Sequence, residues 1–495
     1  MRKIQENETP TAILATGITH IAEANYMLSI INATIINEGR IFHGNIKVNG
    51  DTITEVAEGD APFFAEGEVV DARGKYVIPG VIDEHVHFRQ ASLTDQAATG
   101  KEGVAGNIYT ESRAAAAGGV TSFFDMPNTN PPTTTQEALE DKWKVGQRNS
   151  AINYAFFPGA TNENINFLRS LDASTVPGIK VFMGASTGNM LVDNTSALKE
   201  IFSICAEKGL PVMTHCEDQS LITQNTENAI LTYGEDPDVS VHSIIRNEEV
   251  CVRSTALALQ LAEQTGARLL VAHVSTGKEL DMILSSRAEA KAEVCVSYLM
   301  FCTDDYPTLH SRIKCNPALK NSSERNALRR ALTDGRIWSI ATDHAPHLLS
   351  RKQGGALKAA SGMPSVQFSL PLMLTLADYG ALKKEDVVKL MCHHPANFFG
   401  IQDRGFIRCG YKADLTIVSH LDTPHVITDA DVLSLCGWTP YINKEVTWRV
   451  NTTVCNGKIV YHTPCQQAKR HPEQESEDCN HGERIAFNHD RRQAT

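Results

Sequence analysis

The stretch of sequence that decides the fold reads Pro79-Gly-Val-Ile-Asp-Glu-His-Val-His-Phe-Arg89. It begins with an apolar run and ends in ionisable residues, a pattern typical of a buried strand that reaches a functional face. Side chains two residues apart in a strand point to the same side, so His85 and His87 are predicted to point at one place. Two imidazoles arranged in this way can bind one zinc ion. The alternative is that two histidines share a strand face by chance.

Apolar, strand-like runs alternate with helical patterns from about Val77 to Phe399. Two of the helical patterns cover residues 196–209 and 253–265. The strand-like runs lie at residues 121–125, 179–183, 211–215, 268–273 and 338–343. Repeated units of strand then helix predict a parallel α/β fold, and the length fits a (β/α)8 TIM-type barrel. In such a barrel, the C-terminal ends of the strands form the active-site face.

Ionisable residues stand at the ends of several of these strands. His215, His273 and Asp343 each follow an apolar run. A single histidine at a strand end is usually packed in the core or solvated. Together with His85 and His87, however, these residues form a ligand set with the imidazole and carboxylate donors that suit Zn²⁺. The sequence therefore predicts a metal site at the mouth of the barrel.

Lys180 lies inside an apolar strand, Gly178-Ile-Lys-Val-Phe-Met183. Burial disfavours the ammonium form, so it lowers the pKa of the side chain and leaves a nucleophilic amine. One interpretation is a lysine that forms a salt bridge with a neighbour. The other is an amine that takes up CO₂, giving a carbamate whose two oxygens bridge two zinc ions.

Short β-rich runs flank the alternating region on both sides. They occupy 28–37 and 46–53 before it, and 413–418, 448–454 and 457–461 after it. We expect them to form a small β-sandwich domain built from both chain termini. The predicted division of the chain is an N-terminal extension at 1–26, the small domain at 27–78 and 401–463, the metal-binding barrel at 79–400, and a loose C-terminal tail at 464–495.

The composition excludes several classes of protein. The 495 residues carry a formal net charge of -12, which argues against a nucleic-acid or anionic-membrane partner, because such a surface needs basic patches. The 12 cysteines are scattered without a CxxC pair, which indicates reduced thiols in a cytoplasmic protein. No apolar run is long enough to span a membrane. A small molecule is the expected partner, and the sequence leaves a homo-oligomer open.

Several motifs together resemble the dihydroorotases, a family of the amidohydrolase superfamily. They are His85-Val-His-Phe-Arg89, Asp125-Met-Pro-Asn-Thr-Asn-Pro-Pro132, Gly178-Ile-Lys180, Thr214-His215, Ala272-His-Val-Ser-Thr276, Lys314-Cys-Asn-Pro317 and Thr342-Asp-His-Ala-Pro-His347. The HxH pattern alone is shared by the whole superfamily, whereas the combination with the second and last motifs is specific. The similarity runs from Met27 to about Tyr461. It implies a (β/α)8 barrel with two zinc ions.

The resemblance also implies a reaction, the reversible ring closure of N-carbamoyl-L-aspartate to (S)-dihydroorotate in pyrimidine synthesis. The implied metal ligands are His85, His87 and Asp343 for one zinc ion, His215 and His273 for the other, and carboxylated Lys180 as the bridge, although some relatives use an aspartate there. Asp343 is also the expected catalytic residue. It would take a proton from the attacking water and pass it to the leaving ring nitrogen.

Binding of the substrate is expected to depend on a second set of residues. Arg89 is predicted to share the strand face of the two histidines, where its guanidinium can form two hydrogen bonds to a carboxylate. The family pattern implies that Asn128 and His347 complete this clamp and that Asn316 contacts the ring. The alternatives are a solvated Arg89 and an Asn128 that is only a turn residue.

The chain departs from the family pattern in three places. Residues 90–96 stand where the family commonly reads Glu-Pro-Gly, and Ser297-Tyr298 replaces a histidine pair. The segment Gly362–Ser365 is also altered. None of these changes removes a predicted ligand, so they bear on substrate affinity rather than on reaction class. His344 lies within the last motif and has no expected catalytic role.

Two other functions compete with this hypothesis. A dihydropyrimidinase, hydantoinase or allantoinase would share the metal ligands but would not be expected to keep the carboxylate clamp. A non-catalytic relative that acts as a scaffold would usually have lost metal ligands, whereas all six are present here.

Overall fold

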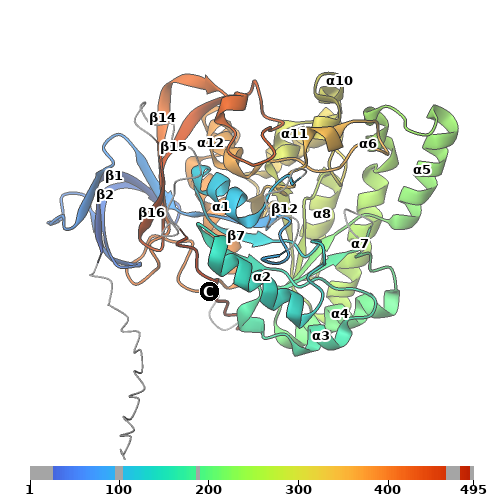
Figure 1. Ribbon diagram of the computed structural model, residues 1–495, viewed down its shortest axis with the longest axis horizontal. Coiled ribbons are helices and arrows are strands. Elements are labelled where there is room, and N and C mark those ends of the chain that lie inside the picture. The colour runs from blue at the N-terminus through green and yellow to red at the C-terminus, as the bar shows by residue number, and fades with distance from the viewer. Residues whose placement is uncertain (1–25, 95–103, 185–189, 464–479, 491–495) are drawn as a thin grey trace, which may run out of the picture.

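A computed structural model describes residues 26–94, 104–184, 190–463 and 480–490. The predicted N-terminal extension therefore lies outside the described residues except for Tyr26. Two bodies of secondary structure are visible in Figure 1, an α/β part ringed by helices and a sheet built from blue and red strands. The first contains every residue of the predicted metal site.

The α/β part contains parallel strands that follow one another along the chain. They are β6 (Val81–Val86), β7 (Val120–Asp125), β8 (Asn153–Phe156), β9 (Ile179–Phe182), β10 (Val212–His215), β11 (Leu269–Val271), β12 (Ala290–Cys295) and β13 (Ser339–Ala341). They form a sheet of order β6-β7-β8 and another of order β13-β12-β11-β10-β9. Single parallel bridges link the two sheets on both sides, Gly159 to Lys180 and Val86 to His344.

Helices connect these strands, as the alternating pattern predicts. The longer ones are α1 (Ile108–Ala117), α2 (Gln136–Asn149), α4 (Thr195–Lys208), α5 (Gln219–Tyr233), α7 (Glu248–Thr265), α8 (Gly277–Ser285), α11 (Ser322–Ala331) and α12 (Ser369–Asp378). The shorter ones are α3 (Ile165–Ser170), α6 (His242–Ile245), α9 (Val296–Met300), α10 (Tyr306–Leu309), α13 (Lys384–Val388) and α14 (His394–Phe399). Within the described ranges, no helix is both long and apolar enough to cross a membrane.

The boundaries of α4 and α7 follow from local capping. The side chain of Asn194 accepts hydrogen bonds from the first turn of α4, and Gly209 ends that helix with a φ of 71°. Asn247 caps α7 in the same way, and two glutamates follow in its first turn. The expected helix at 253–265 therefore begins five residues earlier, at Glu248, because its polar first turn hides the apolar period.

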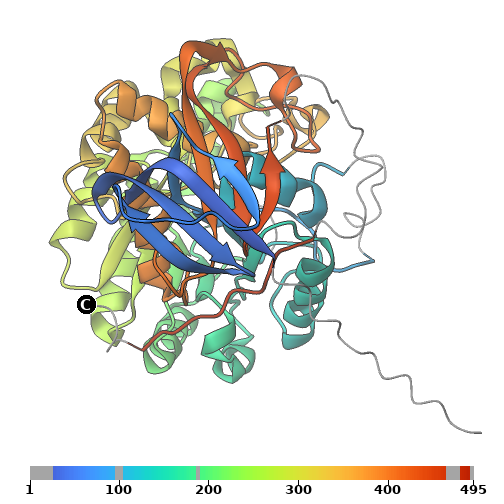
Figure 2. The same ribbon diagram turned by 90° about the vertical axis from the view of Figure 1, so that its left-hand side faces the viewer.

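A second sheet joins the two ends of the chain. Its strands are β1 (Met27–Asn37), β2 (Arg40–Asn49), β3 (Thr52–Glu58), β4 (Glu68–Asp71), β5 (Tyr76–Pro79), β14 (Leu415–Val426), β15 (Glu445–Cys455) and β16 (Lys458–His462). The order is β16-β15-β14-β5-β1-β2-β3, with β4 beside β1. The sequence predicts a sandwich, but these strands form one continuous sheet, because β5 pairs with both β1 and β14. Figure 2 shows blue and red strands side by side in this sheet.

Residues 480–490 form a C-terminal strap that packs against the α/β part, drawn in dark red in Figure 2. The amide of Ile485 donates to the carbonyl of Tyr154 at 3.0 Å, and the amide of Asn488 donates to the carbonyl of Gly400 at 2.7 Å. Ile485 and Phe487 are buried. A loose tail was predicted for 464–495, and for this part the prediction was wrong, since two apolar anchors hold an otherwise polar segment.

The strap should contribute strongly to stability. We expect Phe487→Ala to lower the free energy of unfolding by about 3–5 kcal/mol, because it leaves a cavity against Phe124, 5.7 Å away between ring centroids. Chemical denaturation monitored by circular dichroism measures the change. Tyr233→Ala, at an exposed position, serves as the control and should change stability by no more than about 0.5 kcal/mol. Equal effects of the two substitutions would show that the strap does not stabilise the fold.

Candidate metal centre

The C-terminal ends of the parallel strands bring the predicted ligands together. His85 lies in β6 and His215 ends β10, while His273 and Asp343 follow β11 and β13. The four histidines are buried, and Asp343 is partly exposed. The ring centroids of His85 and His273 are 5.3 Å apart, so the residues form one cluster although they come from distant parts of the chain.

One half of the cluster consists of His85, His87 and Asp343. The Asp343 Oδ1 atom lies 2.9 Å from His87 Nε2 and 3.5 Å from His85 Nε2. One donor atom from each residue lies within 4.8 Å of the others, as binding to a single metal ion requires. The other half is His215 and His273, whose Nδ1 and Nε2 atoms face each other at 2.9 Å.

Acceptors on the outer side fix which nitrogen faces inward in three of the four rings, whereas His273 Nδ1 has no hydrogen-bond partner among the described residues. His85 Nδ1 lies 2.8 Å from Glu293 Oε1, and His87 Nδ1 lies 2.8 Å from Asn128 Oδ1. His215 Nε2 lies 2.8 Å from Glu217 Oε2. When the outer nitrogen donates its proton to an acceptor, the inner nitrogen keeps a free lone pair for a metal ion.

Lys180 lies in the middle of β9 and is fully buried. Its Nζ atom has no hydrogen-bond partner among the described residues. Burial lowers the pKa of this amine, while the nearby carboxylates of Glu293 and Asp343 act in the opposite direction. A buried amine without a partner, next to a cluster of ligands, is unusual for a structural lysine.

Burial favours the neutral form of the imidazoles in the cluster. Burial lowers the pKa of His85, His87 and His273 well below the usual value, and neighbouring positive groups add to the effect. Neutral imidazole is the form that binds metal ions. The donor set and the partnerless Lys180 amine therefore fit a site for divalent cations.

A buried ion pair lies behind His215. The Glu217 carboxylate forms an ion pair with the guanidinium of Arg246, and this charge and the His215 hydrogen bond outweigh burial and lower the pKa of Glu217 to about 2. The following residue, Asp218, caps α5 by accepting from the Leu221 amide. The cap fixes the turn after β10 and thereby the direction of the Glu217 side chain.

Three of the predicted site residues have left-handed backbone conformations. The φ angles are 71° at Arg89, 40° at His273 and 46° at Asp343. Such angles are costly for residues other than glycine and concentrate at functional sites.

Strand β6 ends at Val86, so the predicted sharing of one strand face by His87 and Arg89 was wrong. Arg89 nevertheless lies near Asp343, because the two charges interact.

The predicted substrate-binding residues differ in their surroundings. The Arg89 side chain is half-buried and has no hydrogen bond or ion pair within the described part of the chain. His347 lies near Arg89, and its Nε2 atom is 2.9 Å from the Ser361 carbonyl oxygen. Asn128 contacts the His87 ring, as described above. Asn316 Oδ1 lies 3.0 Å from Nε2 of the buried His242.

Sequence reasoning missed Glu217, Glu293 and His242. Glu293 offered the same signal as Lys180, a charged residue inside an apolar strand, and Glu217 stands two residues beyond His215 at a strand end. Burial raises the pKa of Glu293, and the Lys180 charge opposes that effect. His242 carried no comparable signal, because its partners Cys315 and Asn316 are remote in sequence.

Comparison with known proteins identifies the family. The profile of the amidohydrolase family matches residues 76–460. The chain belongs to the amidohydrolase family. It is a hydrolase acting on cyclic amides, in a family whose members are typically metal-dependent.

Several known amidohydrolases are similar to this chain over most of their length. A dihydroorotase of Halobacterium salinarum is 32% identical, with 88% of this chain and 98% of that protein covered. An allantoinase of Desulfitobacterium hafniense is 28% identical, with 88% and 96% covered. The solved L-hydantoinase of Arthrobacter aurescens has a TM-score of 0.83 and 26% identity, with 94% and 100% covered. The names of these relatives all indicate a cyclic amide as the substrate, but each names a different ring compound.

The outer carboxylates can be tested through metal affinity. We expect Glu217→Gln to weaken binding of zinc by about 10–100-fold, because the acceptor behind a ligand histidine orients the ring and raises its basicity. Competition with a chromophoric chelator measures the affinity. Glu227→Gln, on the exposed side of α5, is the matched control and should bind zinc as the wild type does. Unchanged affinity in Glu217→Gln would exclude this role.

Proposed function

We propose that this amidohydrolase is a dihydroorotase, which hydrolyses (S)-dihydroorotate to N-carbamoyl-L-aspartate and catalyses the reverse ring closure. The observation that supports this proposal is the half-buried guanidinium of Arg89, which forms no hydrogen bond or ion pair among the described residues and interacts only at longer range with the carboxylates of Asp125 and Asp343. A buried cation without a direct hydrogen-bonding partner is costly unless a ligand supplies the opposite charge. Dihydroorotate carries a carboxylate, and the competing cyclic amides, dihydrouracil, hydantoin and allantoin, do not.

The proposed metal centre would hold two zinc ions. His85, His87 and Asp343 would hold the first, and His215 and His273 would hold the second. Lys180 is proposed to be carboxylated and would then serve as the shared ligand, which would give its otherwise partnerless nitrogen a role. When bound, zinc lowers the pKa of a water molecule to about 7 and supplies a nucleophile at neutral pH.

The residues of the chain carry out the remaining steps. Asp343 takes the proton of the attacking water and returns it to the ring nitrogen as the amide bond breaks, acting first as base and then as acid. Arg89 binds the ring carboxylate with two parallel hydrogen bonds. His347 completes this clamp, with Asn316 proposed to contact the ring and Asn128 to hold His87 and the substrate.

The proposal also covers the architecture. We infer that β6 to β13 close into a (β/α)8 barrel through the bridges at Gly159 and Val86. The small domain is taken to comprise 27–78 and 401–463, and the barrel 79–400. Closure places the carboxyl ends of all the strands around one mouth, where the proposed ligands converge.

Cations near the proposed clamp favour an anionic substrate. Lys352 and Arg89 both act electrostatically on His347, and burial together with these charges lowers the pKa of His347 to about 3. A neutral His347 donates from Nε2 to Ser361, which leaves Nδ1 without a proton. A substrate carboxylate beside Nδ1 would favour the protonated ring and so recruit a second donor.

The substrate can be identified directly. We expect the purified zinc-loaded protein to hydrolyse dihydroorotate with a kcat/KM at least about 100-fold above that for dihydrouracil, hydantoin or allantoin, since only the first satisfies Arg89. Loss of absorbance of the ring measures hydrolysis in each case. Brisk turnover of a neutral ring without turnover of dihydroorotate would favour the hydantoinase or allantoinase alternative.

The role of Arg89 predicts a split between substrate and metal binding. Arg89→Met should raise KM for dihydroorotate by about 100-fold, because charge-assisted hydrogen bonds to the carboxylate are lost. The zinc content, measured by plasma mass spectrometry, should stay unchanged. Arg40→Met, on the exposed surface of the small sheet, is the control. Parallel loss of zinc and of binding would assign Arg89 a structural role instead.

The carboxylated lysine has a spectroscopic signature. After incubation with ¹³C-labelled bicarbonate and zinc, the wild type should show a carbamate carbon resonance that is absent from Lys180→Gln. Lys180→Gln should also lose bound zinc, because its amide lacks the negative charge that a bridge supplies. A zinc-loaded wild type without this resonance would refute the modification but not the binding of metal.

A further inference from the structure

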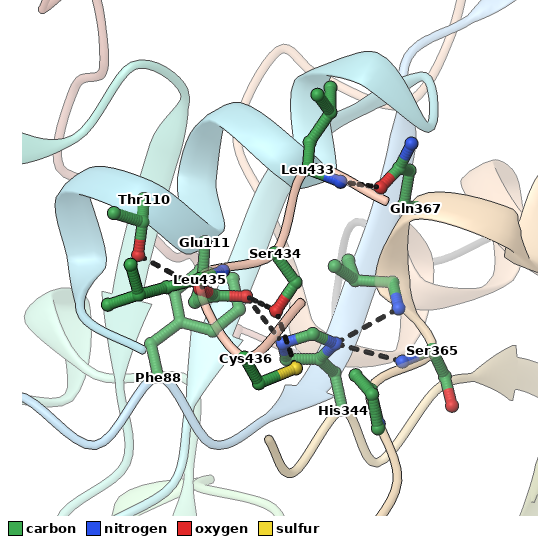
Figure 3. Close-up of polar contacts among 12 residues, drawn as sticks. Phe88, Thr110, Glu111, His344, Ser365, Gln367, Leu433, Ser434, Leu435 and Cys436 are labelled. Carbon is green, nitrogen blue, oxygen red and sulfur yellow. Dashed lines mark hydrogen bonds and ion pairs between the residues drawn. The ribbon is translucent and has the colours of Figure 1, made fainter. Parts of the chain in front are cut away.

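His344 follows the proposed base Asp343 and lies at the centre of a buried polar network (Figure 3). Its Nδ1 atom accepts hydrogen bonds from the backbone amides of Ser365 at 2.9 Å and Val366 at 3.1 Å. Because two donors face Nδ1, the ring proton must reside on Nε2. That nitrogen donates to Glu111 Oε2 at 2.9 Å, so the ring is fixed in one tautomer and one orientation.

Glu111, in the first turns of α1, receives donors on both carboxylate oxygens. Besides His344, the Ser434 hydroxyl donates to Oε2 at 2.6 Å. The Leu435 amide and the Thr110 hydroxyl donate to Oε1 at 3.0 and 2.9 Å. A buried carboxylate with four donors is a strong structural anchor. Glu111 thereby joins His344, which follows β13, to residues 434–435, which lie between β14 and β15 of the small sheet.

The two ends of this network reach the proposed active site. On one side, the His344 carbonyl accepts from the His87 amide at 2.7 Å, and Asp343 immediately precedes it in a left-handed conformation. On the other side, the indole of Trp438 donates to the His347 carbonyl at 2.7 Å. The network therefore connects the proposed metal ligand His87 with the proposed substrate-binding residue His347. The connection runs through residues 434–438, which contain neither a proposed metal ligand nor a proposed substrate-binding residue.

We propose that Glu111 and His344 are positioning residues that fix the segment 434–439 beside the barrel mouth, so that Trp438 holds His347 in place for the substrate carboxylate. This inference rests on the proposed dihydroorotase function for its kinetic consequences. It assigns the small sheet a part in substrate binding, through a connecting segment that reaches across to the barrel. Neither residue touches the substrate or the metal ions in this scheme.

Two substitutions at His344 separate the two sides of its ring. In His344→Asn, the amide oxygen replaces Nδ1 as acceptor for Ser365 and Val366, but the donor to Glu111 is lost. In His344→Gln, the amide nitrogen replaces Nε2 as donor to Glu111, and the acceptor is lost. Both replace one aromatic ring in the same buried place, so they form a matched pair with similar losses of packing against Phe88, whose ring centroid is 5.6 Å away.

The proposal predicts different kinetics for the two variants. His344→Asn should raise KM by about tenfold or more, with kcat within about threefold of the wild type and a full complement of zinc, because only positioning of the clamp is lost. His344→Gln should retain a KM close to that of the wild type. Equal KM values for the two variants, or a fall in kcat and zinc content without a rise in KM, would overturn it.

Trp438→Phe tests the other end of the connection. It removes the hydrogen bond to the His347 carbonyl and should raise KM to a similar extent as His344→Asn. If both act through the same segment, the double variant should have a KM no more than about threefold above that of either single variant, rather than the product of the two effects. Independent, multiplicative effects would contradict the proposed connection.

A measurement without substrate keeps this inference separate from the proposed function. Hydrogen exchange detected by mass spectrometry should show faster exchange over residues 432–439 in His344→Asn than in His344→Gln. The reason is that Glu111, which accepts from the Leu435 amide, is no longer held in place by a donor at position 344 in His344→Asn. If the wild type fails to hydrolyse dihydroorotate but this difference in exchange is found, the proposed function fails and the positioning of the segment stands. If dihydroorotate is hydrolysed but exchange is equal in the two variants, the positioning role fails alone.

Discussion

The buried carboxylate of Glu293 is the contact on which the arrangement of the proposed metal centre depends. One of its oxygens accepts from His85 Nδ1 at 2.8 Å and from the His273 amide at 2.9 Å. A residue of β12 thus holds a ligand from each half of the cluster at a set distance. A buried charge costs several kcal/mol unless it is paired, and burial accordingly raises the pKa of Glu293 to about 8, although the Lys180 charge and the His273 amide favour the ionised form. Replacement of Glu293 would therefore disturb both halves at once.

The cluster of proposed ligands could be predicted because each member has a local signal in the sequence. His215 ends an apolar strand and His273 and Asp343 follow one, and parallel strands bring such ends together whatever the loops do. The order of strands and helices was confirmed for the same reason, since hydrophobic period is a local property. The charged residue in the apolar strand β9 was likewise found, and its complete burial is confirmed.

The partners of these residues could not be predicted from local pattern. Glu293 and His85 are 208 positions apart, and Glu111 and His344 are 233 apart, so no spacing indicates their contact. The contact of the Asn128 side chain with the His87 ring was likewise not foreseen, because the two residues are 41 positions apart. Strand β6 ends at Val86, and Arg89 has a left-handed backbone conformation. The alternation of side chains along a strand does not predict such a change of backbone conformation. The polar average composition of 480–490 led to the prediction of a loose tail, whereas the buried side chains of Ile485 and Phe487 anchor this segment.

The position of the C-terminal strap has a practical consequence for handling the protein. The strap pairs with Tyr154 near the start of β8, and His489 contacts the Val176 carbonyl before β9 and Arg268 before β11. These contacts lie at the amino ends of the parallel strands, whereas the proposed ligands lie at the carboxyl ends. His489 therefore lies on the face opposite the proposed ligands, which makes this end of the chain suitable for an affinity tag or a surface linker. Immobilisation through that end should keep the proposed ligands accessible from solution, provided that the anchors at Ile485 and Phe487 are left intact.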